Sequence, residues 1–237
     1  MKPILKASLV FTKHQAALEQ LFFQLTINMT TIQQQQWRYA CKKFDATKQL
    51  TQQQVKALGQ AFNLTATSYG LQPMKLIVVH NKALQEKLVP ASYGQNQVFE
   101  ASHVLVLCAQ KDMEEQHIQD YFERVKELRN TPDEILNPFK KHLLHWASNT
   151  KQEDLEQWAR KQTYIALGNL LNTCAALEID SCPMEGFNPE AYDELLELKG
   201  SNFTSSLVLP VGFRHDEDYM AGLAKVRKKE EDIIEFR

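Results

Sequence analysis

The segment from Gln162 to Arg227 constrains the fold more than any other part of the chain, because a long helical pattern, a bend and an apolar strand follow one another there. From Leu167 to Leu177, apolar residues occur on every side of a helix, which predicts a buried helix. The run Leu207–Gly212 has the length and the apolar character of a strand. Between them, Pro183-Met184-Glu185-Gly186-Phe187 predicts a tight bend that can aim backbone N–H groups at a ligand.

The apolar pattern predicts further strands and helices. Met74–His80 and His103–Ala109 predict strands, the second buried on both faces, and Thr204–Gly212 predicts a third. Thr51-Gln52-Gln53-Gln54 has the form of a capping box, so a helix is expected to begin there and to end near Asn63.

The remaining helical segments are less regular. Thr30–Arg38 predicts a short helix. Between Asp112 and Trp146 the helical pattern is broken at Pro132 and Pro138, and its many charges indicate a solvated outer layer. From Lys151 the period improves, and one helix face is predicted to be buried: Leu155, Trp158, Ala159, Ile165 and Ala166. No internal repeat or linker is evident, so we expect one α+β domain over residues 29–237 with a C-terminal arm.

The first 28 residues stand apart from this pattern. Leu18, Leu21, Phe22 and Leu25 recur at helical spacing, and the segment lacks the cleavage pattern of a signal peptide. We expect residues 1–28 to form an amphipathic extension, and it stays open whether this extension is integral to the domain or an appendage. No run reaches the 18 or so apolar residues of a membrane-spanning helix, so we expect a soluble protein.

Charge and cysteine content exclude several classes of protein. Twenty-seven Lys and Arg against 29 Asp and Glu leave a net charge of -2, which argues against binding to nucleic acid or to an anionic membrane surface. Any anion site must therefore be local. The four cysteines, Cys41, Cys108, Cys174 and Cys182, form no C-x-x-C pair, and this favours a reducing, cytoplasmic location.

Common catalytic motifs are absent from the sequence. None of the eight glycines forms G-x-G, so neither a Rossmann fingerprint nor a P-loop is present, and G-x-S-x-G and H-E-x-x-H are missing as well. His142 and His145 could share a helix face, but no carboxylate or thiolate stands at the right spacing beside them. We expect no metal site.

What remains is a local set of cations. Arg38 and Lys42 stand four residues apart after the short helix, and Lys225 and Arg227 stand two apart in the arm. A phosphate is best bound by guanidinium together with ammonium groups, and a cation beside a flavin ring stabilises the charge that reduction brings. FMN needs both. Each cation taken alone is more simply a solvated surface charge, so only the joint arrangement favours a flavin site.

In this order, the segments resemble the FMN-dependent nitroreductases that use NAD(P)H, especially their bacterial oxygen-insensitive and dihydropteridine-reductase-like branch, from about Thr30 to the C-terminus. The matching segments are Arg38-x-x-x-Lys42-x-Phe44-Asp45, Gln72-Pro73, Ala101-Ser102-His103-Val104, Gly168-Asn169, Pro183-x-Glu185-Gly186-Phe187, Pro210-Val211-Gly212 and Lys225-x-Arg227. The resemblance implies a nitroreductase-like α+β fold. Its central sheet would be mostly antiparallel or mixed and flanked by helices, with the C-terminal arm exchanged in a homodimer.

The resemblance also implies the roles of individual residues. The phosphate of FMN would lie against Arg38, Lys225 and Arg227, with Tyr39 and Ala40 alongside. Lys42 would lie near the ribityl chain and the N1–O2 edge. Backbone N–H groups of Glu185 and Gly186 would lie at the N5–O4 edge, where together with Lys42 they would tune the ring. Pro183 and Met184 would pack under the ring. The opposite subunit would approach the dimethylbenzene side through Ala66, Thr67, Ser68 and Gly70. The segment Gln95-Asn96-Gln97 is expected at the pyrimidine end, with Asn96 as the contact.

The implied reaction is ping-pong transfer of hydride from NAD(P)H through flavin N5 to a nitroaromatic, quinone or similar small acceptor. The chemistry belongs to the cofactor, so no protein nucleophile is required. Three other functions stay open. The chain could be a flavin-binding sensor or storage protein with little turnover, or a relative that carries out ene reduction or dehalogenation. It could also be a helical interaction module built on residues 112–177.

Overall fold

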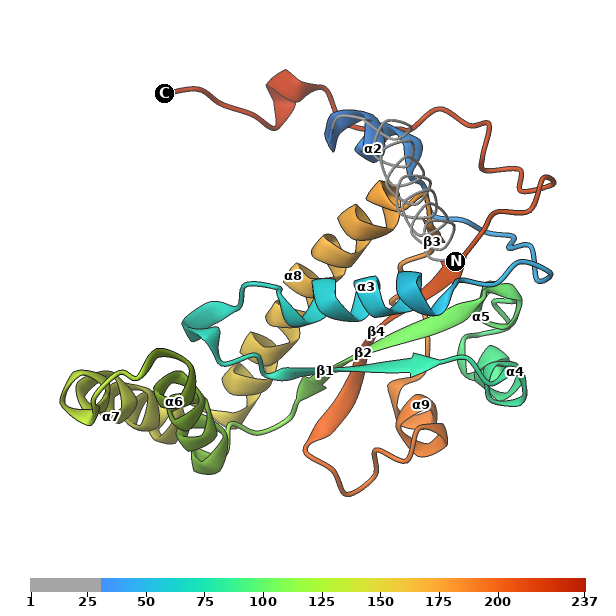
Figure 1. Cartoon of the computed structure of the whole chain (residues 1–237). Helices are drawn as coiled ribbons and strands as arrows, with labels where there is room; N and C mark the ends of the chain where they lie inside the picture. Colours follow the sequence, from blue (N-terminus) through green and yellow to red (C-terminus); the bar gives the residue numbers. More distant parts are fainter. Residues whose placement is uncertain (1–30) are drawn as a thin grey trace, which may run out of the picture. The chain divides into compact units, whose positions relative to one another are not determined.

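The centre of the fold is a pair of antiparallel strands, β2 (His103–Gln110) and β4 (Phe203–Gly212). β1 (Met74–Val79) pairs with the other edge of β2, and β3 (Asp180–Ser181) pairs with β4, which gives the order β1-β2-β4-β3 (Figure 1). The three ladders are all antiparallel. The prediction of an α+β fold with a mostly antiparallel sheet is confirmed.

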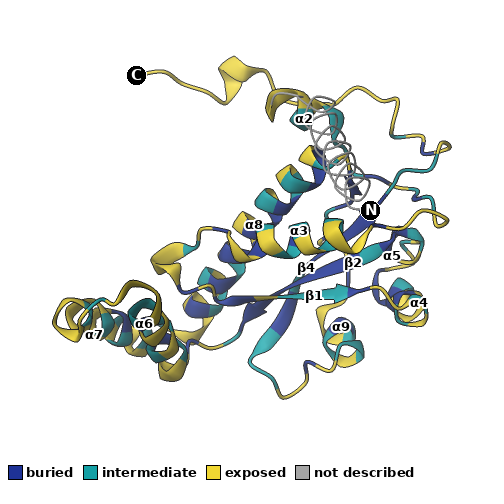
Figure 2. Ribbon diagram, in the orientation of Figure 1, coloured by how far each residue is buried: buried dark blue, intermediate teal, exposed yellow. Residues whose placement is uncertain are grey.

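Helices cover both faces of the sheet. On one face, α3 (Gln52–Asn63) and α8 (Gln152–Ala176) pack against the sheet through Leu58, Leu105, Leu170, Leu207 and Leu209. On the other face lie α4 (Lys82–Ala91), α5 (Gln97–Glu100) and α9 (Pro189–Leu195), and the core there includes Leu88, Val104, Val106, Tyr192 and Val208. Successive residues of a strand point to opposite faces, and in β2 and β4 nearly all residues of both sets are buried because both faces are covered (Figure 2).

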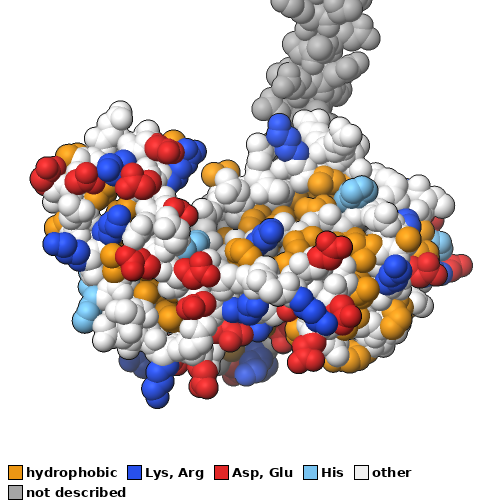
Figure 3. All heavy atoms as spheres, turned by 90° about the horizontal axis from the view of Figure 1, so that it is seen from below, with side chains coloured by type: hydrophobic (Ala, Val, Ile, Leu, Met, Phe, Trp, Pro, Cys, Tyr) orange, Lys and Arg blue, Asp and Glu red, His pale blue; other side chains and the backbone are white. Residues whose placement is uncertain are grey.

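The structure is a computed structural model that describes residues 31–237. Residues 38–237 form one compact unit, and α2 (Thr31–Trp37) belongs to a separate one. The extension predicted for residues 1–28 lies outside the described residues. Within residues 31–237, no helix is long and apolar enough to cross a membrane. On the face shown in Figure 3, acidic and basic side chains are interspersed without a field of one sign.

The capping box predicted at the start of α3 is present. The Gln54 N–H donates to the Thr51 hydroxyl over 3.2 Å, and the Thr51 N–H donates to the Gln54 side-chain oxygen over 2.9 Å. Two N–H groups that the first helical turn leaves without partners are satisfied in this way.

The region predicted as an irregular, solvated layer consists of two regular helices, α6 (Glu115–Arg129) and α7 (Asp133–Asn149). Pro132 caps α7, as a helix break predicts, but the predicted break at Pro138 is wrong because Pro138 lies inside α7. A proline there removes one helical hydrogen bond. Packing offsets this loss, since α6, α7 and the start of α8 share a core that includes Phe122, Leu143 and Leu155.

Burial on every side of the helix from Leu167 to Leu177 is not found in the single chain. Leu167, Leu170, Cys174 and Ala175 are buried, but Gly168, Asn172 and Ala176 are exposed. The predicted buried face also fails at Ile165, which is 50% exposed, beside Tyr164 at 47%. The reason is that α8 packs on the sheet through one side only. An apolar strip of α8 is therefore left on the surface.

Candidate functional site

The segment that follows α2 is held as an added edge beside β3. Ala40 forms an isolated parallel bridge with Ser181, and the Cys41 N–H donates to the Ser181 carbonyl over 3.1 Å. Further along, the Asp45 N–H donates to the Phe213 carbonyl over 2.8 Å. Arg38 to Lys42 therefore lie next to β3 and next to the bend that follows it.

Three of the predicted phosphate ligands converge. The Lys225 ammonium donates to the Arg38 carbonyl. Burial and the nearby Arg227 lower the pKa of the Arg38 guanidinium, and burial together with Arg38, Arg227 and Arg214 lowers the pKa of Lys225. Cations lower the pKa of one another only when they are close enough to repel. The structure thus brings Arg38, Lys225 and Arg227 together.

Lys42, Lys225 and Arg227 differ from several other cations of the described chain in their ion pairing. Within residues 31–237, neither Lys42, Lys225 nor Arg227 forms an ion pair, whereas Lys48 pairs with Asp45 at 3.0 Å. Cations that lie close together and, like Lys225 and Arg227, form no ion pair within the described residues are suited to binding an anion.

Lys42 faces the bend. Its ammonium lies 3.5 Å from the Cys182 sulfur, and the Gln97 side-chain nitrogen lies 3.9 Å from the same atom. Cys182 is fully buried. Burial raises the pKa of the Cys182 thiol, although Lys42 and Gln97 favour the thiolate. The contact places the Lys42 ammonium next to Cys182, the residue that immediately precedes Pro183.

The bend itself is anchored on one side and open on the other. Met184 is buried and exchanges two backbone hydrogen bonds with Val208, at 2.8 and 3.1 Å. Glu185 and Gly186 are exposed, and in the part of the chain that the structure describes their N–H groups donate to no protein acceptor. The anchored Met184 holds two free donors at a fixed place, and the half-buried Pro183 precedes them.

Contacts near the expected pyrimidine end come from the neighbours of Asn96. Asn96 is exposed at the start of α5, and its side chain forms no cap hydrogen bond. The Gln95 side chain donates to the Gly186 carbonyl over 2.7 Å, and the Gln97 side chain reaches both Gln95 and Cys182. The sequence pointed to Gln95-Asn96-Gln97 as a segment but favoured Asn96 within it, because three successive polar residues carry no signal that separates them.

The loop expected to serve the partner subunit lies apart from the cations. Ala66, Ser68 and Gly70 are exposed and Thr67 is half-buried. No contact described in residues 31–237 joins them to Arg38 or Lys225. This loop is fixed from behind, because the Ser68 N–H donates to the buried Gln162 side chain over 2.9 Å.

Gln162 is a residue that sequence reasoning missed. A buried glutamine on a helix that otherwise packs apolar residues could have drawn attention to it, since buried polar groups require partners. The same loop carries backbone strain, with Tyr69 at φ 60°. The Tyr69 ring packs against Trp146, with ring centroids 5.3 Å apart.

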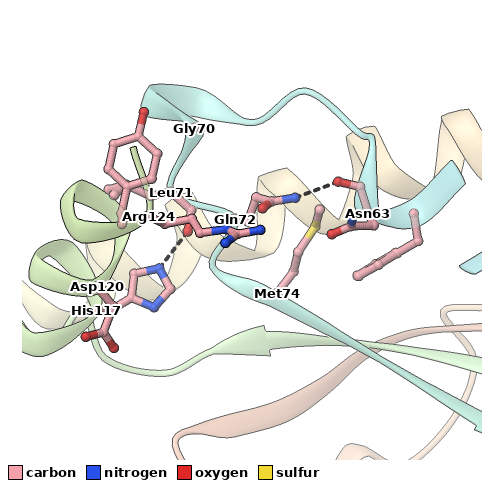
Figure 4. A pocket seen from close by; sticks show the side chains of 10 residues that line it. Asn63, Gly70, Leu71, Gln72, Met74, His117, Asp120 and Arg124 are labelled. Atoms are coloured by element: carbon pink, nitrogen blue, oxygen red, sulfur yellow. Dashed lines mark hydrogen bonds between the residues drawn. The ribbon is translucent and has the colours of Figure 1, made fainter. Parts of the chain in front are cut away.

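A pocket of about 300 Å³ lies on the other side of this loop, between the loop, the end of α3 and α6 (Figure 4). His117 contacts the Leu71 carbonyl at 2.6 Å, and the Gln72 side chain donates to the Asn63 carbonyl over 2.7 Å. Of the predicted site residues only Gly70 lines it. This pocket is thus a separate feature from the cation cluster.

Tyr39 is held by two groups of the C-terminal segment. Its ring lies 4.7 Å from the Arg214 guanidinium, and its hydroxyl donates to the Asp218 carboxylate over 3.0 Å. Arg214 is in turn paired with Asp180 at 2.6 Å. The Tyr39 side chain is therefore engaged in contacts within the protein, and its backbone is the part that can face a phosphate.

The thiols offer no nucleophile. All four cysteines are reduced and fully buried. Burial raises the pKa of Cys108 and of Cys174 to about 12, and it also raises the pKa of Cys41 and Cys182. A buried neutral thiol is inert. Within residues 31–237, no group of three or more His, Cys, Asp or Glu side chains could hold a metal ion.

Comparison with known proteins agrees with the geometry. The sequence model of the Nitroreductase family matches residues 36–213. A Staphylococcus epidermidis protein provisionally named an NAD(P)H nitroreductase is 35% identical over 220 residues, which cover 89% of this chain and 98% of that protein.

Solved structures share the fold. A nitroreductase-type protein from Exiguobacterium sibiricum, crystallised in complex with FMN, superimposes with a TM-score of 0.77 at 17% identity, covering 90% of this chain and 99% of that chain. An enone reductase of gut-bacterial fatty acid saturation, CLA-ER, superimposes with a TM-score of 0.74 at 18% identity, covering 89% of this chain and 99% of that chain.

Proposed function

The chain belongs to the nitroreductase family, and from this premise we propose that it is an FMN-dependent oxidoreductase that reduces nitroaromatic, quinone or similar small acceptors with NAD(P)H. Residues 29–237 are the proposed FMN-binding domain, and the protein is proposed to be a cytoplasmic homodimer. We propose neither a nucleic acid nor a membrane as a partner.

The observation that carries the proposal is the convergence of Arg38, Lys225 and Arg227 beside β3, where burial and, after it, repulsion from neighbouring cations lower the pKa values of Arg38 and Lys225. An anion between these groups removes the repulsion and gains charge-assisted hydrogen bonds. The phosphate of FMN fits this requirement, because guanidinium and ammonium groups are the usual partners of a phosphate.

The other end of the site fits the ring. The Lys42 ammonium lies next to Cys182, and the free N–H groups of Glu185 and Gly186 follow two and three residues after Pro183. Such preorganised donors and a cation favour negative charge at the polar edge of the ring. Gly186 allows close approach, because it has no side chain to cover its own N–H.

FMN, when bound, supplies the two-electron chemistry that links NAD(P)H to the acceptor in ping-pong order. The residues of the chain bind and orient. Arg38, Lys225 and Arg227 hold the phosphate, Met184 forms part of the floor, and the exposed loop Ala66–Gly70 of a second copy covers the remaining side.

The proposal is tested by purifying the protein, recording its visible spectrum and identifying the released flavin. We expect bound FMN that is reduced on anaerobic titration with NADH or NADPH. Steady-state rates with a nitroaromatic and a quinone should give parallel double-reciprocal lines. A colourless protein would contradict the proposal, and bound FMN that neither nicotinamide reduces would favour a sensor or storage protein.

The acceptor class is tested in the same experiment. Rates with a nitroaromatic, a quinone, an enone and a halogenated aromatic are compared at equal NAD(P)H. We expect the first two to be reduced fastest. A preference for the enone or the halogenated compound would replace the proposed acceptor with ene reduction or dehalogenation, because fold alone does not fix the acceptor.

A further inference from the structure

A buried carboxylate from the C-terminal segment organises the residues around Lys42. Asp218 is 3% exposed. One of its oxygens accepts three hydrogen bonds, from the Lys42 N–H over 2.8 Å, the Lys43 N–H over 3.3 Å and the Tyr39 hydroxyl over 3.0 Å. The other oxygen accepts from the Met220 N–H over 3.1 Å. Three of the four hydrogen bonds that Asp218 accepts therefore come from one short segment, residues 39–43.

Asp218 differs from the acidic residues around it. Asp180 pairs with Arg214 and Glu217 pairs with Lys43, whereas Asp218 forms no ion pair within the described residues. Burying an unpaired carboxylate is costly unless hydrogen bonds satisfy it. Burial alone would raise the pKa of Asp218, but its N–H donors and the Cys41 thiol lower that pKa below the usual value. Asp218 is thus a charged, fully bonded anchor.

The anchor fixes the direction of Lys42. Two successive N–H groups that point at one oxygen determine the turn of the backbone at Lys42 and Lys43. The Lys42 side chain then extends to the sulfur of Cys182, and it is left without a carboxylate partner. Asp218 stays close enough to act on Cys182 electrostatically, yet it binds the Lys42 backbone and not its ammonium.

We propose that Asp218 is a positioning residue of the flavin site, which binds the Lys42 and Lys43 amides and thereby places the Lys42 ammonium at the polar edge of the ring. This inference rests on the proposed function, in which FMN is the cofactor. It assigns to the arm a second task beside phosphate binding, because Asp218 lies seven residues before Lys225 in the same segment.

An asparagine cannot replace this aspartate. A carboxamide has one oxygen and an NH₂ group, so either the amides of Lys42 and Lys43 or the amide of Met220 would face another donor. Asp218→Asn therefore keeps the shape of the side chain but loses its negative charge and at least one of these hydrogen bonds, which weakens its hold on the turn. Glu217→Gln is the matched control, because Glu217 is the adjacent acid, is largely exposed and binds only surface cations.

The test is a double-mutant cycle on FMN affinity. The dissociation constant of FMN is measured by quenching of flavin fluorescence for the wild type, Asp218→Asn, Lys42→Met and the double variant. We expect Asp218→Asn to weaken FMN binding on the order of tenfold in the wild-type background. In the Lys42→Met background the same change should weaken it less than about threefold, because residues that act through one contact are not additive. Glu217→Gln should leave the affinity unchanged.

Two results would overturn the inference: unaltered FMN affinity in Asp218→Asn, or an equal loss in both backgrounds, which would mean that Asp218 acts on overall stability or on Arg38. If Asp218→Asn does not fold, Tyr39→Phe takes its place, because it removes one donor from the same carboxylate, and it is measured in the same two backgrounds. We expect a smaller loss of FMN affinity that is not additive with Lys42→Met. An additive loss would overturn the inference. A wild-type protein that binds no FMN would defeat the proposed function itself, which separates the two failures.

Discussion

Lysine and arginine side chains of this protein differ in whether a carboxylate pairs with them. Lys43, Lys48 and Arg214 are each matched to an acid, at Glu217, Asp45 and Asp180. Lys225 is not matched within the described residues, and its pKa is lowered by burial and by neighbouring cations. A pH dependence of ligand binding follows from this difference.

We predict that FMN affinity falls as pH rises through the lowered pKa of Lys225. A phosphate favours the protonated lysine, so binding raises that pKa back and takes up a proton in the interval between the two values. The loss should reach about tenfold, the size of one charge-assisted contact, and should begin below the usual lysine value of 10.5. FMN dissociation constants measured from pH 7 upward check this.

The control for the pH prediction is riboflavin, which lacks the phosphate and should bind independently of this titration. Lys225→Gln should bind FMN more weakly at pH 7 and show no further loss. An equal pH dependence for riboflavin and FMN would contradict the role of Lys225.

At the scale of single elements, local sequence signals decide where helices begin. The capping box at Thr51 satisfies two N–H groups of α3, and α3 in turn buries Leu58 and Phe62 against the sheet. Asn188 and Pro189 provide a comparable start for α9, where the Asn188 side chain accepts from the Ala191 N–H.

Thr51→Ala should lower the free energy of unfolding by about 1 kcal/mol, because it removes the side-chain acceptor of the box. Urea denaturation followed by circular dichroism measures the change. Gln53→Ala, an exposed change in the first turn of the same helix, serves as the comparison and should alter stability by less than about 0.5 kcal/mol. Equal effects of the two substitutions would show that the cap contributes nothing specific.

Elements with a strong local or apolar pattern could be predicted from the sequence, and elements formed by tertiary packing could not. β2 and β4 were predictable because their residues are apolar on both faces. The two-residue β3 carries no pattern of its own, and Pro138 lies inside α7, a helix that shares a core with α6. α9 had an N-terminal signal that was overlooked.

The candidate site shows the same division. Arg38, Lys42, Lys225 and Arg227 could be proposed from residue type, order and resemblance. Asp218 and Gln162 could not, because their contacts join segments that are far apart in the chain, such as Lys42 with Asp218. An aspartate in a polar arm has no sequence feature that distinguishes a buried acceptor from a solvated charge.

At the scale of the whole molecule, one chain presents two parts of a site that no contact in residues 31–237 brings together. The cations and the bend form one part, and the loop Ala66–Gly70 forms the other. The exposed strip of α8 at Tyr164 and Ile165 lies outside the apolar core of the described residues, although the Tyr164 side chain hydrogen-bonds Glu185. We propose that a second copy packs on this strip, which would bury it and bring in the loop.

Ile165→Lys is therefore expected to shift the protein from dimer to monomer and to weaken FMN binding as a consequence. Sedimentation velocity over a concentration series measures the first effect, and flavin content after gel filtration measures the second. Leu128→Lys, at a position 65% exposed on α6, is the control and should change neither. A wild-type protein that is monomeric and retains its FMN would contradict the two-chain site.

The most direct test of the central claim compares the dissociation constants of FMN and riboflavin for the wild type at pH 7. If Arg38, Lys225 and Arg227 form a phosphate site, FMN should bind at least about a hundredfold more tightly than riboflavin, the equivalent of two charge-assisted contacts. The double variant Lys225→Gln/Arg227→Gln should lose most of that ratio. Equal affinities for FMN and riboflavin in the wild type would show that the converging cations do not bind the cofactor phosphate.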